Sequence, residues 1–212
     1  MNIYNVIILD ESGSMSSIYK ETLTSMNEVL SGIKKNQEAF PEQHHYVTIV
    51  TFEGNGISGV KTRRDRVPID TIEPFTEKDY RLGGCTPLYD AMGKTLNELE
   101  GLIHPEDKVM ATVITDGMEN SSQEYSGKVI KTLVARLREK GWVLAYVGAN
   151  QNAIEVARDL NIGNALNYEA TPSGVLGCGF VLKRACRIMS KKAMLDIDLG
   201  KYETLFDEKD ED

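Results

Sequence analysis

Three short polar stretches of the chain carry oxygen-bearing side chains that could together hold a metal ion. The stretches are Asp10-Glu11-Ser12-Gly13-Ser14, Gly83-Gly84-Cys85-Thr86 and Thr115-Asp116-Gly117. The candidate ligands within them are two carboxylates and three hydroxyls, on Asp10, Asp116, Ser12, Ser14 and Thr86. These hard oxygen donors suit Mg²⁺, Mn²⁺ or Ca²⁺ and do not suit zinc. The residue types therefore predict a divalent-cation site.

Each stretch also has a simpler structural interpretation. The serines of the first stretch could cap a helix, because their hydroxyls accept hydrogen bonds from free backbone N–H groups. Thr86 followed by Pro87 is typical of a helix start, and Asp116-Gly117 is typical of a turn. Taken singly, any of these interpretations accounts for its own stretch, so the argument for a metal rests on the three stretches together.

The spacing of the first stretch favours convergence on one point. Asp10, Ser12 and Ser14 alternate along the chain, and a glycine between the serines allows a sharp turn. A cation near the positive end of a helix needs carboxylates beside it. We therefore assign these three residues to the cation and expect Ser16 and Ser17 to cap the helix behind it.

Hydrophobic patterning predicts an alternation of strands and helices that would position these stretches. Short apolar or β-branched runs predict strands at 6–9, 46–52, 109–114, 142–147 and 165–168. Apolar stripes at helical spacing predict helices at 19–33, 88–103, 129–137, 154–160 and 172–194. Gly54-Asn55-Gly56, followed by 57–61, predicts a hairpin with a returning strand.

This order predicts an α/β fold of three layers, with helices on both faces of a mainly parallel central sheet and one antiparallel edge strand. In such folds ligands bind beyond the carboxyl ends of the strands, where the three polar stretches fall. Gly54, Gly56 and Gly59 also match a dinucleotide-binding pattern, but that pattern needs a helix opening at the glycines. The residues from 60 to 72 have no helical stripe, so we do not expect nucleotide binding there.

D-x-S-x-S, G-G-x-T and T-D-G, in this order, resemble the metal-ion-dependent adhesion site of a von Willebrand factor type A domain. The resemblance covers the whole strand and helix order and implies a Rossmann-like sandwich of that family. It implies a cation coordinated by Ser12, Ser14 and Thr86, with Asp10 and Asp116 bound directly or through water. It also implies an open metal position that takes an Asp or Glu from a partner protein.

Three further stretches are similar to those of intracellular bacterial and phage-encoded members of the family. They are Gly141-Trp142-Val143, Val147-Gly148-Ala149-Asn150-Gln151 and Asn164-Ala165-Leu166-Asn167-Tyr168. The resemblance thus favours a cytoplasmic, non-enzymatic protein-binding module.

Other functions remain open at this point. A haloacid dehalogenase-type phosphatase also begins with an apolar strand ending in Asp, here Asp10, but needs a second Asp where this chain has Ser12. A serine hydrolase lacks the G-x-S-x-G elbow, and His44 and His45 would point to opposite faces of a strand, which fits a solvated turn better than a metal site. A structural scaffold with an unused metal site is the third alternative.

Composition limits the remaining classes. The 212 residues carry a net charge of −8, which gives no electrostatic footprint for nucleic acid, and no apolar stretch is long enough for a membrane. The local basic group at 61–66 sits among strand signals and is interpreted as a solvated edge. Three cysteines without paired close spacing suggest free thiols in the cytoplasm. We expect one domain at 1–200 and an acidic, disordered tail at 201–212. The alternative that this tail occupies the metal site, in cis or in a neighbouring copy, is left open.

Overall fold

The computed structural model describes residues 1–149, 152–195 and 197–208, which fold around a sheet of six strands. The spatial order is β3-β2-β1-β4-β5-β6. The strands are β1 (Asn2–Asp10), β2 (His44–Phe52), β3 (Val60–Pro68), β4 (Lys108–Thr115), β5 (Val143–Ala149) and β6 (Asn164–Tyr168). Neighbours are parallel except β2 and β3, which are antiparallel. The predicted mainly parallel sheet with one antiparallel edge strand is confirmed.

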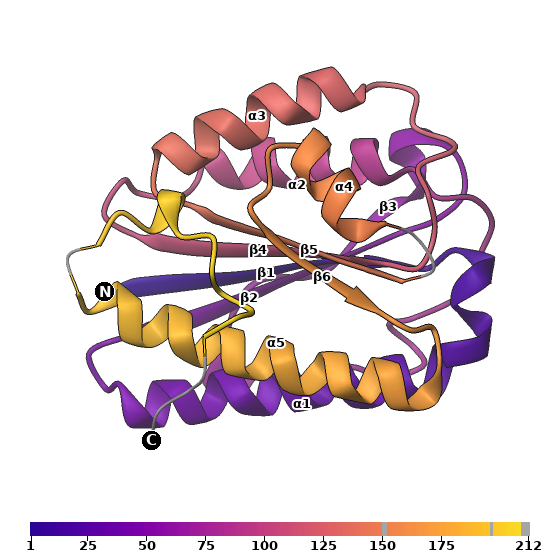
Figure 1. The fold of residues 1–212 in the computed structure, drawn as a ribbon. Helices are drawn as coiled ribbons and strands as arrows, with labels where there is room; N and C mark the ends of the chain where they lie inside the picture. Colours follow the sequence, from indigo (N-terminus) through magenta and orange to yellow (C-terminus); the bar gives the residue numbers. More distant parts are fainter. Residues whose placement is uncertain (150–151, 196, 209–212) are drawn as a thin grey trace.

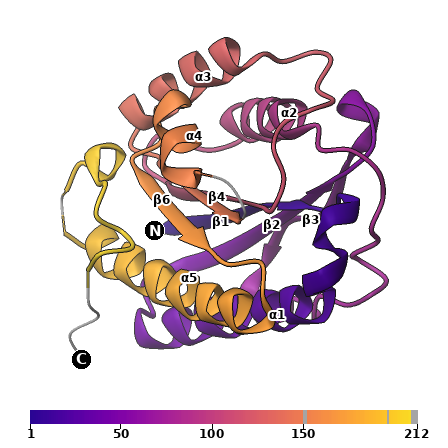
Figure 2. The ribbon, with the colours of Figure 1, turned by 45° about the vertical axis from the view of Figure 1, so that its right-hand side comes forward.

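Helices cover both faces of the sheet. They are α1 (Tyr19–Ala39), α2 (Leu88–Glu100), α3 (Gly127–Glu139), α4 (Ala153–Asp159) and α5 (Pro172–Ala193). α1 and α5 lie side by side on one face, and α2, α3 and α4 lie over the other (Figures 1 and 2). Each face has its own apolar cluster, because the buried strands present apolar side chains in both directions.

The central strand β1 shows how the sequence builds this arrangement. Ile7 and Leu9 belong to the apolar cluster under α1 and α5, whereas Val6 and Ile8 belong to the cluster on the other face. A continuous apolar run is therefore required at a strand that is covered twice. Leu9 pairs with Ile114 of β4. The last residues of the two strands, Asp10 and Thr115, therefore lie at the same edge of the sheet.

The edge strand β3 differs from its prediction. A short 3₁₀ helix, η2 (Gly56–Gly59), follows the turn, so the returning strand begins at Val60 instead of 57 and continues to Pro68. The sequence did not predict the full length of β3, because most of its side chains are polar and give no apolar run. A strand, and no α-helix, follows the three glycines, so the geometry required for dinucleotide binding is absent from this described segment.

The chain continues to pack on the body beyond residue 200. Leu205 is fully buried, and its backbone N–H donates to Oδ1 of Asn164 at 3.0 Å. Arg184 of α5 donates to the carbonyl of Phe206 at 2.9 Å. The expected disordered tail at 201–212 therefore needs correction over 201–208, where apolar side chains anchor the segment. Residues 209–212 lie outside the described residues, as do Asn150 and Gln151 of the stretches compared above.

Within the described parts of the chain, none of the helices combines the length and apolar character that a membrane crossing requires. All three cysteines are free thiols: Cys85 is exposed, while Cys178 and Cys186 are buried. Both buried cysteines lie on α5 and belong to the apolar cluster beneath it.

Candidate metal centre

The three polar stretches meet at the carboxyl edge of the sheet. The first follows β1 and leads into a 3₁₀ helix, η1 (Gly13–Ile18), ahead of α1. The second precedes α2, and the third follows β4. β1 and β4 are adjacent and parallel, so their carboxyl ends deliver Asp10 and Asp116 to the same place. The site predicted at this edge is thus assembled by the strand order itself.

Backbone hydrogen bonds join the first two loops. The N–H of Gly13 donates to the carbonyl of Gly84 at 3.2 Å, and the N–H of Gly83 donates to the carbonyl of Glu11 at 2.8 Å. A Cβ at Gly83 would lie 2.1 Å from Oε2 of Glu53, so no larger residue fits there without displacement. Gly83 thus leaves room for the side chain of Glu53, whereas a Cβ at Gly84 would make only ordinary contact, 3.6 Å from Cα of Gly54.

Asn120 joins the second and third loops. Its Oδ1 accepts from the backbone N–H of Thr86 at 2.8 Å, and its own N–H donates to the carbonyl of Thr86 at 3.2 Å. Glu119, next in the chain, accepts from the backbone of Tyr89 at 2.9 Å and from Ser122. The loop carrying Asp116 is in this way tied to the start of α2, which fixes Thr86 relative to it.

The candidate ligand oxygens are close to one another. Oγ of Ser12 and Oγ of Ser14 are 3.0 Å apart, and Oγ of Ser14 donates to Oδ1 of Asp116 at 2.5 Å. The other contacts converge at Gly117: the position that a Cβ would take there lies 3.1 Å from Oγ1 of Thr86 and 3.7 Å from Oδ2 of Asp10 and from Oγ of Ser14. The structure brings all five predicted residues together.

None of the three hydroxyls serves as a helix cap. Ser12 precedes η1 without a side-chain capping bond, and α2 is preceded by Pro87 and not by Thr86. The expectation that Ser16 and Ser17 cap the first helix is wrong, because both lie inside η1 and Ile18 takes the cap position of α1. The simpler interpretation of these serines and of Thr86 is therefore not supported.

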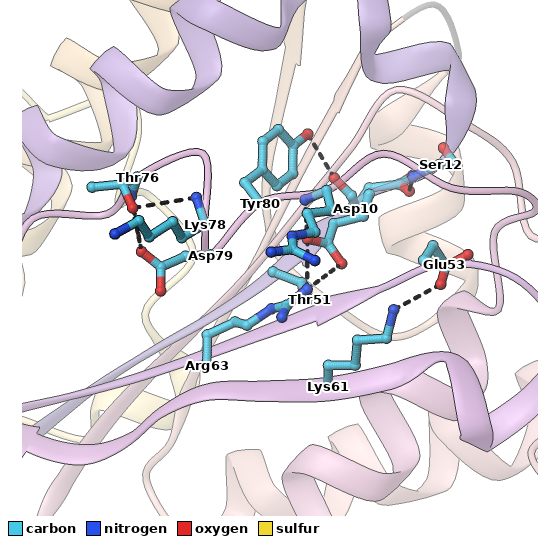
Figure 3. Close-up of polar contacts among 12 residues, drawn as sticks. Asp10, Ser12, Thr51, Glu53, Lys61, Arg63, Thr76, Lys78, Asp79 and Tyr80 are labelled. Carbon is cyan, nitrogen blue, oxygen red and sulfur yellow. Dashed lines mark hydrogen bonds and ion pairs between the residues drawn. The ribbon is translucent and has the colours of Figure 1, made fainter.

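Asp10 is held from several sides. Its Oδ1 accepts from the N–H of Ser12 at 2.7 Å, and its carbonyl accepts from the hydroxyl of Tyr80 at 2.9 Å (Figure 3). Its Oδ2 accepts from Oγ1 of Thr115 at 2.6 Å. Burial raises the pKa of Asp10 to about 6, against the opposing effect of the bond from Thr115. Burial also raises the pKa of Asp116.

Glu11 has a structural role that sequence reasoning missed. Its side chain is fully buried and accepts two hydrogen bonds from Nη2 of Arg63, at 2.9 and 3.0 Å. The backbone N–H of Arg81 donates to the same carboxylate at 2.8 Å. Arg63 also donates to Thr51 of β2 (Figure 3). This ion pair links the edge strand β3 to the loop that follows β1.

Thr115 and Asn120 are two further residues that the pattern of ligands did not indicate as positioning groups. Thr115 is fully buried and belongs to the T-D-G turn, but only the structure shows that its hydroxyl bonds to Asp10. Asn120 lies in a polar loop whose composition carries no positional signal. Both form hydrogen bonds to residues that are distant in the sequence, and hydrophobic periodicity carries no information on such contacts.

The donor set fits an oxygen-ligated cation. In an octahedral Mg²⁺ shell with bonds of about 2.1 Å, adjacent oxygens lie about 3 Å apart, which matches the separation of the Ser12 and Ser14 hydroxyls. Among the described residues there is no cluster of three or more His, Cys, Asp or Glu that could hold a metal. A cation here would therefore depend on hydroxyls as well as on the two carboxylates.

Asp207 and Glu208 lie away from this edge of the sheet. Glu208 pairs with Lys192, in the last turn of α5, at 3.0 Å. Figures 1 and 2 place the C-terminal end of the described chain on the side of the molecule opposite η1. These two carboxylates therefore do not reach the candidate metal centre of their own chain; the remainder of the acidic tail lies outside the described residues.

Comparison with known proteins gives likeness in fold alone. No family model and no curated protein matches the sequence. A solved structure of proximal thread matrix protein 1 from the mussel byssus is 16% identical, with a TM-score of 0.56, over 87% of this chain and 46% of that one. The pilus adhesin SpaC from Lactobacillus rhamnosus GG, in its open conformation, is 13% identical, with a TM-score of 0.63, over 90% and 30%.

A D319A mutant of the PilB minor pilin from Streptococcus sanguinis is 11% identical, with a TM-score of 0.61, over 93% of this chain and 64% of that one. This chain spans less than half the length of the mussel and SpaC chains and under two thirds of the PilB chain. The shared part is an arrangement of helices and strands at sequence identities too low to transfer any role.

Proposed function

We propose that this chain is a protein-binding module of the von Willebrand factor type A kind, with a Rossmann-like fold and a divalent cation at the carboxyl edge of its sheet. The observation that carries the proposal is the convergence of Thr86, Asp10 and Ser14 around Gly117, which brings three separate loops together. Mg²⁺ is the first candidate ion, and Mn²⁺ and Ca²⁺ are the alternatives.

The donor chemistry explains how such a site would bind a protein. Hydroxyl ligands are neutral, so they leave much of the charge of the cation uncompensated. An Asp or Glu from a partner can then complete the coordination shell. Met118, directly after Gly117, is 70% exposed and provides an adaptable apolar contact beside the metal. Binding would depend on both the cation and the carboxylate of the partner.

The positions of the histidines weigh against the hydrolase alternative. His44 and His45 begin β2 and so lie at the amino edge of the sheet, and His104 precedes β4 at the same edge. A serine at the metal site would therefore have no histidine as its general base. The phosphatase alternative still has Asp10 but finds a serine, Ser12, where its chemistry needs an acid.

The scaffold alternative, with an unused metal site, predicts the same fold and differs only in partner binding. The three free thiols support placing the protein in the cytoplasm. We propose no nucleic-acid or membrane partner.

Titration calorimetry tests the metal site. Mg²⁺ and Mn²⁺ should bind to the wild type and should lose most of their affinity in Asp116→Asn, which keeps the shape of the side chain and removes its charge. Asp159→Asn, on an exposed residue of α4, is the matched control and should bind as the wild type does. Equal, negligible heats in all three proteins would refute the metal site.

Partner binding needs its own test. A protein retained on the immobilised chain with Mg²⁺ should be released by EDTA and should not bind Asp116→Asn. Changing one Asp or Glu of that partner to Ala should abolish the interaction. Retention that is indifferent to EDTA would contradict the proposal, and metal-dependent turnover of phosphatase substrates, lost in Asp10→Ala, would favour the enzyme alternative.

A further inference from the structure

A cationic groove lies between α1 and α5, away from the candidate metal centre. These two helices lie side by side (Figures 1 and 2). The groove has a volume of about 250 Å³, and the side chains that line it include Lys35, Asn36, Phe180, Lys183, Arg184 and Arg187. Asn36 is 17 residues beyond the first residue of α1, or about 25 Å along the helix from its metal-facing end.

Two donors at this groove have no hydrogen-bond partner among the described residues. Nδ2 of Asn36 is one, on a side chain that is only 2% exposed, and Nε of Arg184 is the other. The guanidinium of Arg184 is held in place, because its Nη2 donates to the carbonyl of Phe206 at 2.9 Å. A buried donor without an acceptor costs about 1–3 kcal/mol. Both atoms therefore call for an acceptor that residues 1–149, 152–195 and 197–208 do not supply.

The charge of the groove defines what that acceptor is. Four cationic side chains line it, and no acidic residue does. Glu28 pairs with Lys183 at 3.1 Å from outside the lining. This gathering of cationic side chains stands out in a chain whose net charge is −8. Unpartnered donors beside cationic side chains are the features of an oxyanion site.

Phe180 indicates what accompanies the oxyanion. Its ring is 64% exposed beside the cationic side chains, where an aromatic group could stack on it. The groove is slightly smaller than the roughly 300–1,000 Å³ of pockets for drug-sized ligands. A phosphate group with one planar ring therefore fits its size and chemistry.

The geometry points to a binding site for an aromatic phosphomonoester of the mononucleotide class, with the phosphate between Asn36 and Arg184 and the ring on Phe180. The site is independent of the proposed metal-dependent function, because it shares no residue with the metal centre. Binding would fasten α1 to α5 at the end of the molecule remote from that centre.

Titration calorimetry with adenosine 5′-monophosphate, ribose 5-phosphate and inorganic phosphate tests the site. EDTA is present throughout, so that phosphate cannot bind through a metal. All three probes should bind the wild type, the mononucleotide most tightly, and Phe180→Ala should remove that advantage. Equal affinity of the wild type for the mononucleotide and ribose 5-phosphate would overturn the assignment of the aromatic part.

Substitutions in the groove test the phosphate contacts. Asn36→Leu should weaken binding about tenfold or more, the loss expected for one hydrogen bond to a charged group. It removes an unpartnered donor, so the thermal midpoint should be unchanged or higher, which separates lost binding from lost folding. Lys35→Gln should weaken binding about threefold, the effect of one exposed charge.

Lys34→Gln is the matched control, since Lys34 is the exposed neighbour of Lys35 and does not line the groove. Its affinity for the mononucleotide should equal that of the wild type. Wild-type affinity in both Asn36→Leu and Lys35→Gln would overturn the site. A failure of all three probes to bind would overturn it as well.

Discussion

The carboxylate of Asp10 illustrates how single residues prepare the candidate metal centre. Both of its oxygens accept hydrogen bonds from the chain, from the N–H of Ser12 and from the hydroxyl of Thr115. Such bonds orient a metal ligand and lower the cost of keeping it ionised, although burial still raises the pKa of Asp10 to about 6. Thr115 is therefore a positioning residue that acts through Asp10.

Thr115→Val should weaken Mg²⁺ binding by about 10–100-fold, the usual effect of removing a group that orients a metal ligand. The substitution keeps the shape of the side chain, so the free energy of unfolding should fall by only about 1 kcal/mol. Calorimetric titration and urea denaturation measure the two effects. Thr112→Val, on the same strand, is the control and should leave the metal affinity unchanged. Equal metal affinity in the two variants would contradict the role of Thr115.

His45 is a second residue whose surroundings the sequence did not reveal. We predicted a solvated turn, and this is wrong for His45, which is 1% exposed at the start of β2. Nδ1 of the ring lies 3.3 Å from Nδ2 of Asn5, and Nε2 lies 3.1 Å from Oε1 of Gln43. Gln43 is oriented by its own bond to the carbonyl of Ser190 at 2.8 Å. The network suits a neutral ring that accepts at Nδ1 and donates at Nε2.

The free energy of unfolding should decrease as the pH falls, because of His45. Burial lowers its pKa from 6.5 to about 4, so between these values the unfolded chain binds a proton that the folded chain does not. This contribution to stability is present above pH 6.5 and is lost as the pH falls, by about 2 kcal/mol at pH 5.

Urea denaturation between pH 5 and 8 measures this slope. His45→Gln should have a shallower slope than the wild type, and His44→Gln, on the exposed neighbour, should keep the slope of the wild type. Parallel slopes for the wild type and His45→Gln would show that the ring is not held neutral in the fold.

At the scale of elements, the success of sequence reasoning depended on the strength of the hydrophobic pattern. The stripe from Tyr19 to Ile33 predicted α1, and the apolar run from Val6 to Leu9 predicted β1, because both elements face buried clusters. The rule that ligands bind beyond the carboxyl ends of parallel strands then predicted that the three polar stretches lie together. The extent of β3 was missed, since an edge strand has no apolar run, and the caps were missed because η1 replaces the expected helix start.

The ion pair between Arg63 and Glu11 should be the main electrostatic link of β3 to the sheet. Arg63→Ala leaves the carboxylate of Glu11, which has no exposed surface, without its cation, and should cost about 3–5 kcal/mol of unfolding free energy. The double variant Glu11→Gln/Arg63→Gln should recover much of this loss, because it removes the buried charge. Chemical denaturation measures all three proteins.

Arg66→Gln supplies the comparison, since its partner Asp65 is on the same strand and both side chains are exposed, at 36% and 54%. Its cost should be no more than about 1 kcal/mol. If Arg63→Ala proves as mild as Arg66→Gln, water reaches Glu11 and the pair does not anchor β3.

At the scale of the whole molecule, the two edges of the sheet have different roles. The carboxyl edge gathers the oxygen donors, whereas His45 and its polar network lie at the amino edge. The segment 201–208 packs beside β6, where the N–H of Leu205 donates to Asn164. The charged composition of the segment gave no indication of this packing. Composition averages over a segment, while packing depends on single side chains such as Leu205.

Leu205 should stabilise the domain although it lies beyond the boundary that the sequence suggested. Its side chain is fully buried in the cluster beneath α1 and α5, and its N–H is bonded to Asn164 of β6. Leu205→Ala should therefore cost about 2–5 kcal/mol of unfolding free energy. Leu102→Ala, on a side chain that is 52% exposed, should change it by less than about 0.5 kcal/mol. Because Leu205 is far from the loops of the candidate metal centre, the folded fraction of Leu205→Ala should keep its affinity for Mg²⁺. Equal urea midpoints for Leu205→Ala and Leu102→Ala would show that the segment 201–208 does not belong to the cooperative fold.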